Sequence, residues 1–393
     1  MIPLNSLLES AHALFPELKA LKEDLHRHPE LAFHESRTTA LLTEKLASLD
    51  LEFIDLGMET GVVALLRGAN PGKTVALRAD IDALPYQEPA GGDVVSEIPG
   101  RMHACGHDFH TAGLYGAARL LCARREELHG DVVFLFQPAE ETTNGAQAMI
   151  AHGLWEKLPK KPDYIFGLHN RPEIATGDIA VVEGPLMAGK TSFTLSFHGV
   201  GGHGGSPHRC TDVLVAAAAF IQGVQTVVSR NVDPMDPIVC GVCSIHGGEP
   251  ELITDKVDLT GSIRAHSTSN IDLAVRRVGE LAEYTARAYN CTAELNIIPQ
   301  VPVTYNPPEV TVLARRAAEA VVGAGHIVQP RPALGSEDFA VYQQDVPGFF
   351  YWLGVGFPGK ENATWHNEGF CTDDSALPLG AALLAQSAVE ALR

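Results

Sequence analysis

The chain has 393 residues, of which 45% are hydrophobic and 20% are charged, and its formal net charge is −19. This length predicts two domains, or one large domain with an insertion, in an ordinary soluble globular protein. The acidic balance argues against nucleic acid and anionic membranes as partners, although a few local cations can still hold a small anionic substrate.

The sequence also favours a cytoplasmic location. No apolar run is expected to reach the length of a membrane span, and the N-terminal 30 residues lack the basic and apolar regions of a signal peptide. Seven scattered cysteines fit a reducing compartment better than a disulfide framework. Cys240 and Cys243 have C-x-x-C spacing, but they lie in a predicted strand and are expected to be core residues.

Residues 1–184 alternate between helical and strand patterns. A turn at Pro71-Gly72 is expected between the first two strands. Helices are predicted over 5–28, 35–48, 111–127 and 144–152, and strands over 61–67, 73–79, 131–137 and 163–168. Candidate functional side chains follow three of these strands, which is typical of an α/β sheet with a crevice site at its carboxyl edge.

A different pattern occupies residues 185–299. Its order is βαββαβ, the ferredoxin-like arrangement, and glycine and proline breaks delimit it. The strands are predicted over 190–198, 237–246, 256–265 and 291–298, and the helices over 211–229 and 269–289. We therefore expect 185–299 to be inserted into a catalytic domain made of 1–184 and 300–393. The last part of that domain should hold helices over 309–323 and 377–391 and a strand near 349–353.

Residues 102–111 contain three histidines, a cysteine and an aspartate. Cys105 and His107 stand two apart, so both can reach one metal ion from a turning loop, and Gly106 lets the backbone turn tightly. Thiolate with imidazole suits zinc, cobalt, nickel or iron better than magnesium or calcium. Asp108 could bind metal or orient a ligand histidine. The alternative is a polar loop with a buried free cysteine.

Further candidate ligands lie downstream. Glu140 and Glu141 directly follow a predicted buried strand and point different ways, so one can bind metal while the other takes a proton from water. His169 ends the next strand, and His366 stands far off in sequence. Each histidine alone is more often a satisfied polar residue than a ligand. Together with the 102–111 stretch they supply enough ligands for two metal ions, especially if one ligand bridges.

Seven strings occur in an order seen in one family: LRADIDALP, HACGHDFHTA, QPAEE, GLHNRP, GVGGHGGSPH, GSEDF and WHNEGF. From about residue 20 onward the chain resembles the two-metal aminoacylase/carboxypeptidase family of metallopeptidases. The most similar branch contains hippurate hydrolase, N-acyl-amino-acid amidohydrolases and plant auxin-conjugate hydrolases. The resemblance implies an α/β catalytic domain with a central mixed sheet flanked by helices. It also implies a ferredoxin-like insert that serves as lid and dimerisation domain, and hence a homodimer.

The same resemblance implies a role for individual residues. Glu140 would be the catalytic base, and His203, from the insert, would stabilise the oxyanion. Arg264 would pair with the substrate carboxylate, with Asn231 near that carboxylate. The implied cofactors are two divalent ions per subunit (Zn, Mn, Co or Ni), and their implied ligands are Cys105, His107, Glu141, His169 and His366.

We therefore expect a metal-dependent amidohydrolase that cleaves N-acyl amino acids, such as hippurate or N-acetyl conjugates, to a carboxylic acid and a free amino acid. One alternative is a metallo-dipeptidase or carboxypeptidase on the same site, and another is a non-catalytic metal- or ligand-binding protein. Residues 251–254 and 368–372 depart from the family's pattern, which leaves the acyl and amino-acid preference open. Residues 199–204 fit G-x-G-x-x-G, but they lack the βαβ context of a dinucleotide site.

Overall fold

The structure is a computed structural model that describes residues 6–393. The described chain divides into two compact units. The first unit contains the described residues up to Gly184, together with Tyr305–Arg331 and Asp338–Arg393. The second contains Pro185–Thr304 and Pro332–Glu337, so residues 300–304 and 332–337 lie outside the unit to which the sequence assigned them.

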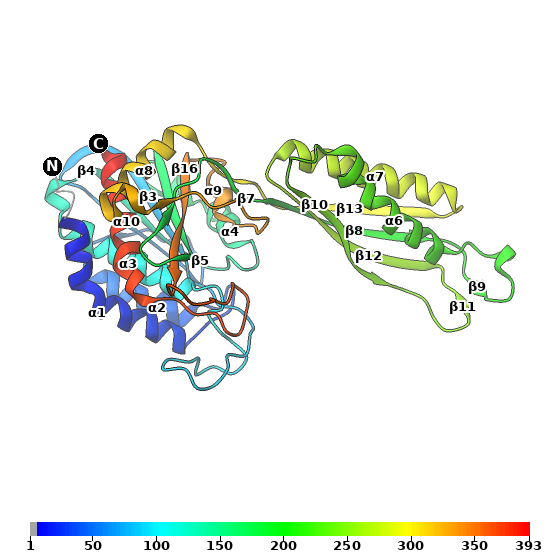
Figure 1. The fold of residues 1–393 in the computed structure, drawn as a ribbon, viewed down its shortest axis with the longest axis horizontal. Coiled ribbons are helices and arrows are strands. Elements are labelled where there is room, and N and C mark those ends of the chain that lie inside the picture. Colours follow the sequence, from blue (N-terminus) through cyan, green and yellow to red (C-terminus); the bar gives the residue numbers. More distant parts are fainter. Residues whose placement is uncertain (1–5) are drawn as a thin grey trace. The chain divides into compact units, whose positions relative to one another are not determined.

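An eight-stranded mixed sheet forms the centre of the first unit (Figure 1). The long strands β4, β3, β5 and β16 lie side by side and parallel, and β2 runs antiparallel to β4. In spatial order the strands are β1 (Glu52–Phe53), β2 (Val62–Leu66), β4 (His129–Gln137), β3 (Asn70–Asp80), β5 (Tyr164–Ala175), β16 (Gly348–Gly356), β6 (Ile179–Ala180) and β15 (Ile327–Val328).

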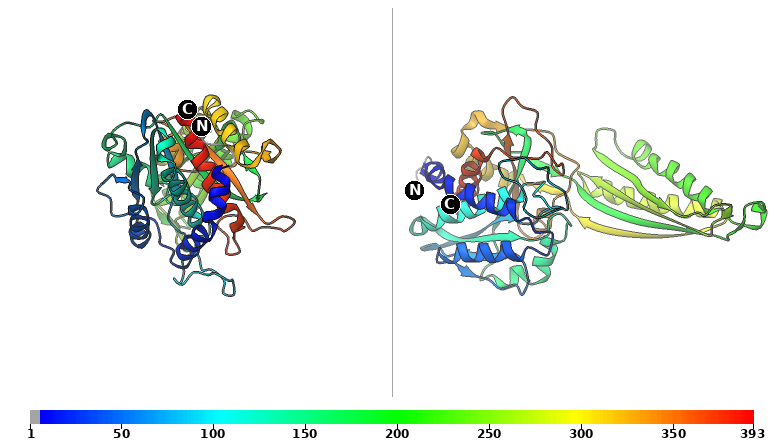
Figure 2. Two further views of the ribbon diagram at one scale, coloured as in Figure 1. Left: turned by 90° about the vertical axis from the view of Figure 1, so that its left-hand side faces the viewer. Right: turned by 90° about the horizontal axis from the view of Figure 1, so that it is seen from below.

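Five helices share one apolar cluster with alternate residues of these strands. They are α1 (Ser6–Arg27), α2 (Ser36–Ala47), α3 (His107–Cys122), α8 (Pro308–Val322) and α10 (Leu377–Leu392). Helix α10 is buried along almost its whole length, and α1, α3 and α10 lie side by side (Figures 1 and 2). Alternation in β3 sends Val75, Leu77 and Ala79 into this cluster. The shorter helices are α4 (Gly145–Ala151), α5 (Leu154–Lys157) and α9 (Phe339–Tyr342).

The long elements predicted for this unit are present, but the expected turn at Pro71-Gly72 is wrong. Both residues belong to β3, and β4 lies between β2 and β3. The β3–β4 register shifts between Asn70 and Lys73. A Cβ on Gly72 would lie 2.2 Å from the His129 carbonyl oxygen, so glycine here permits close backbone approach at a bulge. Strand β5 also continues past its predicted end, to Ala175.

The second unit is a four-stranded antiparallel sheet in the order β10-β12-β8-β13. Helices α6 and α7 pack against each other and share an apolar cluster with the sheet (Figure 1). In chain order the elements are β8 (Gly189–His198), α6 (Val213–Asn231), β10 (Ile238–His246), β12 (Lys256–Ala265), α7 (Thr268–Ala288) and β13 (Thr292–Val301). This confirms the ferredoxin-like insert. Asp212 and Ser267 cap the two helices: Asp212 accepts two backbone N–H groups and Ser267 accepts one.

Several short elements complete the described chain. There are two further two-stranded sheets among the described residues. One pairs β9 (Gly202–His203) with β11 (Leu252–Ile253), and the other pairs β7 (Gly184–Met187) with β14 (Thr304–Asn306). Short 3-10 helices span Arg125–Glu127, Pro207–Arg209, Ala324–His326 and Asp374–Ala376. All seven cysteines are free. Cys240 is buried as expected, but Cys243 is exposed, because residues three apart on a strand face opposite sides.

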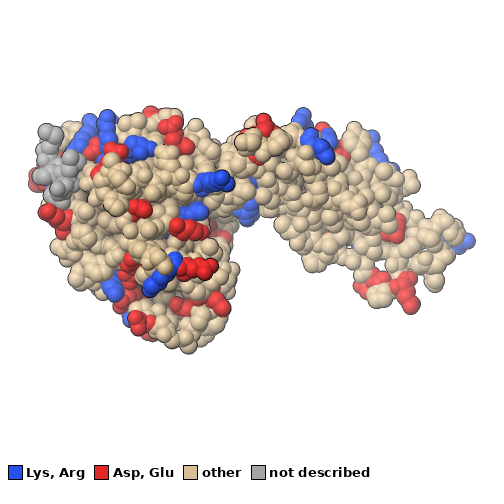
Figure 3. Space-filling model, viewed as in Figure 1, with Lys and Arg blue, Asp and Glu red and all other residues tan. Residues whose placement is uncertain are grey.

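Two described helices are long and apolar enough to cross a membrane by length and composition alone: Val213–Asn231 and Asp374–Leu392. The expectation of no such run is therefore wrong on those measures. The second is a core helix, because 94% of its apolar window is buried. The first lays Phe220, Val224 and Val227 into the core of the second unit. On the face drawn in Figure 3, acidic and basic side chains are interspersed, without an extended basic area over the described residues.

Candidate metal centre

The carboxyl ends of three parallel strands gather the acidic and imidazole side chains of the first unit. Asp80, at the end of β3, pairs with Gln137, at the end of β4. Glu140 and Glu141 follow β4 within four residues. His169 lies on β5 just beyond Gly167, the last residue that pairs with β3. The expected gathering of functional side chains at one edge of the sheet is therefore present.

The turn before α3 supplies the next two side chains. Gly106 has a φ of +79° and precedes His107, the first residue of α3. A Cβ at Gly106 would lie 2.5 Å from the Asn170 Nδ2 atom, so only glycine fits. Asn170 Nδ2 also donates a hydrogen bond to the Cys105 carbonyl oxygen at 2.6 Å. The helix begins four residues earlier than predicted, so His107 is held by a helix rather than by a loop.

The five predicted ligands converge in two overlapping groups. The ligand atoms of Cys105, His107 and His169 lie within 4.8 Å of one another, and so do those of Cys105, Glu141 and His366. The Cys105 Sγ atom is 3.4 Å from His169 Nε2. Glu141 places one carboxylate oxygen 3.6 Å from His107 Nε2 and the other 3.3 Å from His366 Nε2. Cys105 belongs to both groups, so it would contribute to holding either ion.

The environment of these side chains fits bound metal ions. Nε2 of His107 and Oε1 of Glu141 are buried without a hydrogen-bond partner among the described residues. Such orphaned buried atoms need a ligand, an ion or water. Thiol, imidazole and carboxylate together form the donor set of a transition-metal site rather than of a magnesium or calcium site.

The protonation states point the same way. Burial, with the carboxylates of Glu141 and Glu140, raises the pKa of the Cys105 thiol well above its usual range, so only a cation at the site would favour the thiolate. Burial and the neighbouring His110 lower the pKa of His169 well below its usual range, which leaves a neutral imidazole. For His107 burial opposes the charge, but Asp80, Asp82 and Glu141 outweigh it and raise the pKa to about 10. Metal must therefore displace a proton from His107.

Neighbouring groups orient the ligands. The Nδ1 of His169 lies 2.8 Å from the Asn170 carbonyl oxygen, to which it donates, so Nε2 presents its lone pair to the site. Asp82 lies 3.3 Å from His107 Nδ1. The expectation that Asp108 binds metal or orients a ligand histidine is wrong. Its Oδ2 pairs with His26 Nδ1 at 2.8 Å instead.

A buried guanidinium ties the strand ends together. Arg78 on β3 is 1% exposed and donates to Asp80 Oδ2, Gln137 Oε1 and Asp338 Oδ1 at 2.8–2.9 Å. Asp80 in turn accepts from His110 Nδ1 at 2.6 Å. A charge this deep is stable only because every partner is in place. Arg78 and its aspartate partners thus fix the positions of the strand ends next to the metal ligands.

Asp82 fixes the turn that carries the two glutamates. Its Oδ1 accepts the Glu140 N–H at 2.9 Å and its Oδ2 accepts the Glu141 N–H at 3.0 Å. The sequence motifs alone assign no role to Asp80 or to Asp82, which end and follow β3, respectively. The feature of the sequence that could have indicated a role is their position at a strand end, which places their carboxylates at the same edge of the sheet as the metal ligands.

The comparisons with known proteins agree with this geometry. The model of peptidase family M20/M25/M40 matches residues 76–390. The chain belongs to this family. It is 38% identical to an N-acetylcysteine deacetylase of Bacillus subtilis, over 96% of this chain and 97% of that protein. It is 35% identical both to thermostable carboxypeptidase 2 of Saccharolobus solfataricus, over 93% of each chain, and to an IAA-amino acid hydrolase of Arabidopsis thaliana, over 98% and 88%.

A solved structure of the same family shows the fold in full. It is a dinuclear metal-binding peptidase from Bacillus subtilis, with a TM-score of 0.85, 35% identity and coverage of 97% of this chain and 99% of that one. The predicted family resemblance is therefore confirmed. As a member of the M20 family, the chain is a metal-dependent hydrolase of amide bonds.

Three further predicted site residues of this M20 enzyme lie in the second unit. His203 is exposed on β9, and its Nδ1 accepts the Gly205 N–H at 2.9 Å. Arg264, on β12, donates to Ser336 Oγ at 3.0 Å and to the Leu334 carbonyl at 3.3 Å. Asn231, at the end of α6, donates back to the Thr226 carbonyl at 2.7 Å. The substrate-binding roles of Arg264 and Asn231 stay predictions.

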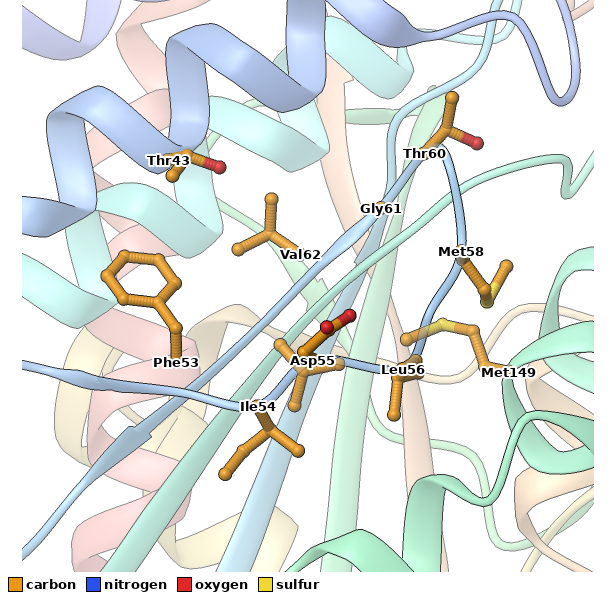
Figure 4. Close-up of a pocket in the computed structure, with 11 residues that line it drawn as sticks. Thr43, Phe53, Ile54, Asp55, Leu56, Met58, Thr60, Gly61, Val62 and Met149 are labelled. Atoms are coloured by element: carbon orange, nitrogen blue, oxygen red, sulfur yellow. The ribbon is translucent and has the colours of Figure 1, made fainter.

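Another hollow of the first unit carries no comparable chemistry. A cavity of about 190 Å³ is lined mainly by apolar side chains of residues 53–63 and by Met149 (Figure 4). Leu56, Met58 and Met149 gather at one side of it. It contains neither a histidine nor a cysteine, and its one acid, Asp55, is exposed. The metal-ligand cluster is thus the better candidate for catalysis.

Substituting a ligand that belongs to both groups should remove more metal than substituting a ligand that belongs to one. We expect Cys105→Ala to lose both metal ions and His366→Ala to lose one, with activity lost in each. Elemental analysis per subunit measures this, and circular dichroism should show an intact fold. The matched controls are Cys243→Ala and His208→Ala, which change exposed residues of the second unit. Unchanged metal stoichiometry in both ligand variants would contradict the assignment.

Proposed function

We propose that this enzyme hydrolyses the amide bond of N-acyl amino acids, releasing a carboxylic acid and a free amino acid. The observation that carries the proposal is the pair of overlapping ligand groups that share Cys105, with the Glu140 carboxylate beside them. The names of the deacetylase and of the plant hydrolase support an acyl-amino-acid substrate. We propose Zn, Mn, Co or Ni as the two ions, on the chemistry of the thiol and imidazole ligands.

In this proposal, Cys105, His107, Glu141, His169 and His366 hold two divalent cations, which supply Lewis-acid activation when bound. Glu140 accepts a proton from the attacking water and delivers it to the leaving nitrogen. Asp82 holds this base in place through the two N–H groups that it binds. Glu140 is only 7% exposed, so little bulk water competes for its proton.

The second unit contributes the remaining groups of the proposal. His203 Nδ1 accepts a hydrogen bond from Gly205, so the neutral ring carries its proton on Nε2 and can donate it to an oxyanion. Arg264 is half-buried and presents a guanidinium for the substrate carboxylate. Asn231 is assigned to the same carboxylate in this proposal. We further propose a cytoplasmic homodimer built through the second unit, with neither nucleic acid nor membrane as a partner.

A substrate panel tests the proposal. The purified chain is reconstituted separately with Zn²⁺, Mn²⁺, Co²⁺ or Ni²⁺ and assayed on N-acetyl amino acids, hippurate and the matching free dipeptides. We expect the acylated substrates to be cleaved faster, because a free α-amino group needs an acidic partner in the site. A Glu140→Gln preparation made in parallel controls for contaminating hydrolases. Faster turnover of the dipeptides would overturn the proposal.

One specific observation favours a second candidate, a carboxypeptidase, because a relative covering 93% of the chain bears that name. The same panel separates the two, since a carboxypeptidase also cleaves N-blocked dipeptides at their C-terminal peptide bond. Metal binding without turnover on any of these substrates would mean that the enzyme hydrolyses another kind of amide, and would overturn the proposal.

A further inference from the structure

The residue before the proposed base has a backbone conformation that side chains rarely adopt. Ala139 has a φ of +58°, in the left-handed region that favours glycine. It is fully buried and directly precedes Glu140. A disfavoured conformation at this point persists only if neighbouring groups hold it. The orientation of the Glu140 side chain therefore depends on the groups that stabilise the Ala139 conformation.

A buried carboxyl group from another part of the chain stabilises the Ala139 conformation. Glu35, at the N-terminal end of α2, is 0% exposed, and its Oε1 accepts the Ala139 N–H at 2.9 Å. Asp82 accepts the next two N–H groups, those of Glu140 and Glu141. Two carboxyl groups on different elements therefore bind three successive N–H groups of this turn. Although Glu35 occupies the N-cap position of α2, its side chain forms no capping hydrogen bond with that helix.

Glu35 acts here as a hydrogen-bond acceptor rather than as a full charge. Burial and the nearby Asp82 carboxylate raise its pKa to about 7, so a large fraction is neutral near neutral pH. An uncharged acceptor of the same length should therefore serve equally well. An apolar side chain of the same length should not, because it leaves the Ala139 N–H buried and unpaired.

We propose that Glu35 is a positioning residue for catalysis: by holding the strained Ala139 turn, its carboxyl group aims Glu140 at the substrate and water. This inference rests on the proposed role of Glu140 as the base. It assigns Glu35 no contact with substrate or metal. Its effect should therefore fall on kcat and not on KM or on metal content.

Two variants of nearly equal size test it. Glu35→Gln keeps an acceptor for the Ala139 N–H, whereas Glu35→Met fills the same space without one. We expect Glu35→Met to lower kcat by about 10–100-fold, the size of effect that a small misplacement of a reacting group produces, with KM and metal content unchanged. Glu35→Gln should retain most of the wild-type kcat. Equal kcat values for the two variants, high or low, would overturn the proposal.

Two further variants separate positioning from stability. Leu42→Ala, fully buried in the same helix, should lower the melting temperature but leave kcat unchanged. A kcat that falls in Leu42→Ala as far as in Glu35→Met would mean that the loss is one of stability. If Glu35→Met does not fold, Glu35→Asp serves, because it withdraws the carboxyl group by one methylene. Glu35→Asp should lower kcat without changing KM or metal content, and wild-type turnover by this variant would overturn the proposal.

Failure of the proposed base is distinguishable from failure of this inference. Wild-type turnover in Glu140→Gln would remove the role of Glu140, whatever the Glu35 variants do. A slow Glu140→Gln enzyme combined with equal kcat in Glu35→Gln and Glu35→Met would leave the base in place and overturn only the role of Glu35.

Discussion

Glu140→Gln is expected to lower kcat by about 10²–10⁴, the range for loss of a positioned general base, while both metal ions remain bound. Glutamine preserves the shape of the side chain, and the Asp82 carboxylate still binds the N–H groups of residues 140 and 141. The amide cannot accept the proton of the attacking water. Steady-state kinetics together with elemental analysis measure both parts of this expectation.

The neighbouring glutamate gives the matched comparison. Glu141→Gln should lose metal as well as activity, because Glu141 lies 3.6 Å from His107 and 3.3 Å from His366 through its two oxygens. Near-wild-type turnover of metal-loaded Glu140→Gln would contradict the assignment of the base. Asp108 is not available for this role, because its Oδ2 pairs with His26 Nδ1.

The second large effect concerns His203 and the proposed homodimer. We propose that His203 serves the active site of the neighbouring subunit of that homodimer, as the family resemblance implies. His203→Ala and Glu140→Gln homodimers should then both be nearly inactive. A mixed dimer would hold one site with both residues intact and one site with neither. Random reassortment of equal amounts makes about half of the dimers mixed, so activity should recover to roughly a quarter of wild type.

A second mixture controls for nonspecific rescue. Glu140→Gln and Cys105→Ala change residues of the same unit, and no mixed dimer of these two variants contains an intact site. Their mixture should stay inactive after the same refolding or co-expression. If verified mixed dimers of His203→Ala and Glu140→Gln are as inactive as their parents, His203 does not act across the interface.

Local sequence patterns predicted the long helices, the ferredoxin-like order and the gathering of ligands at strand ends. These features follow from hydrophobic periodicity and from the rule that parallel strands place their carboxyl ends at one edge. The ligand set itself was implied by the family resemblance, and the structure brings all five residues together. The bulge at Pro71-Gly72 was mistaken for a turn, because proline and glycine mark both, and only the pairing with β4 distinguishes them.

Contacts between distant segments could not be predicted in the same way. Asp108 pairs with His26, 82 residues away, and Glu35 binds Ala139, 104 residues away. Neither partner leaves a trace in the periodicity around the other. The buried pairing of Arg78 with Asp338, 260 residues apart, is of the same kind. Such contacts depend on which elements pack together, which a single sequence does not encode locally.

The unequal exposure of the ligands has a consequence for how the two ions are exchanged. The side chain of His366 is 49% exposed, on a loop outside helices and strands. Cys105, His107 and His169 are all buried. An ion held by the three buried ligands can leave only when the surrounding structure opens, whereas one held partly by His366 faces the solvent and is released when that single side chain swings away. We therefore expect an ion bound at the outer position to exchange with divalent cations in solution faster than an ion bound at the inner position.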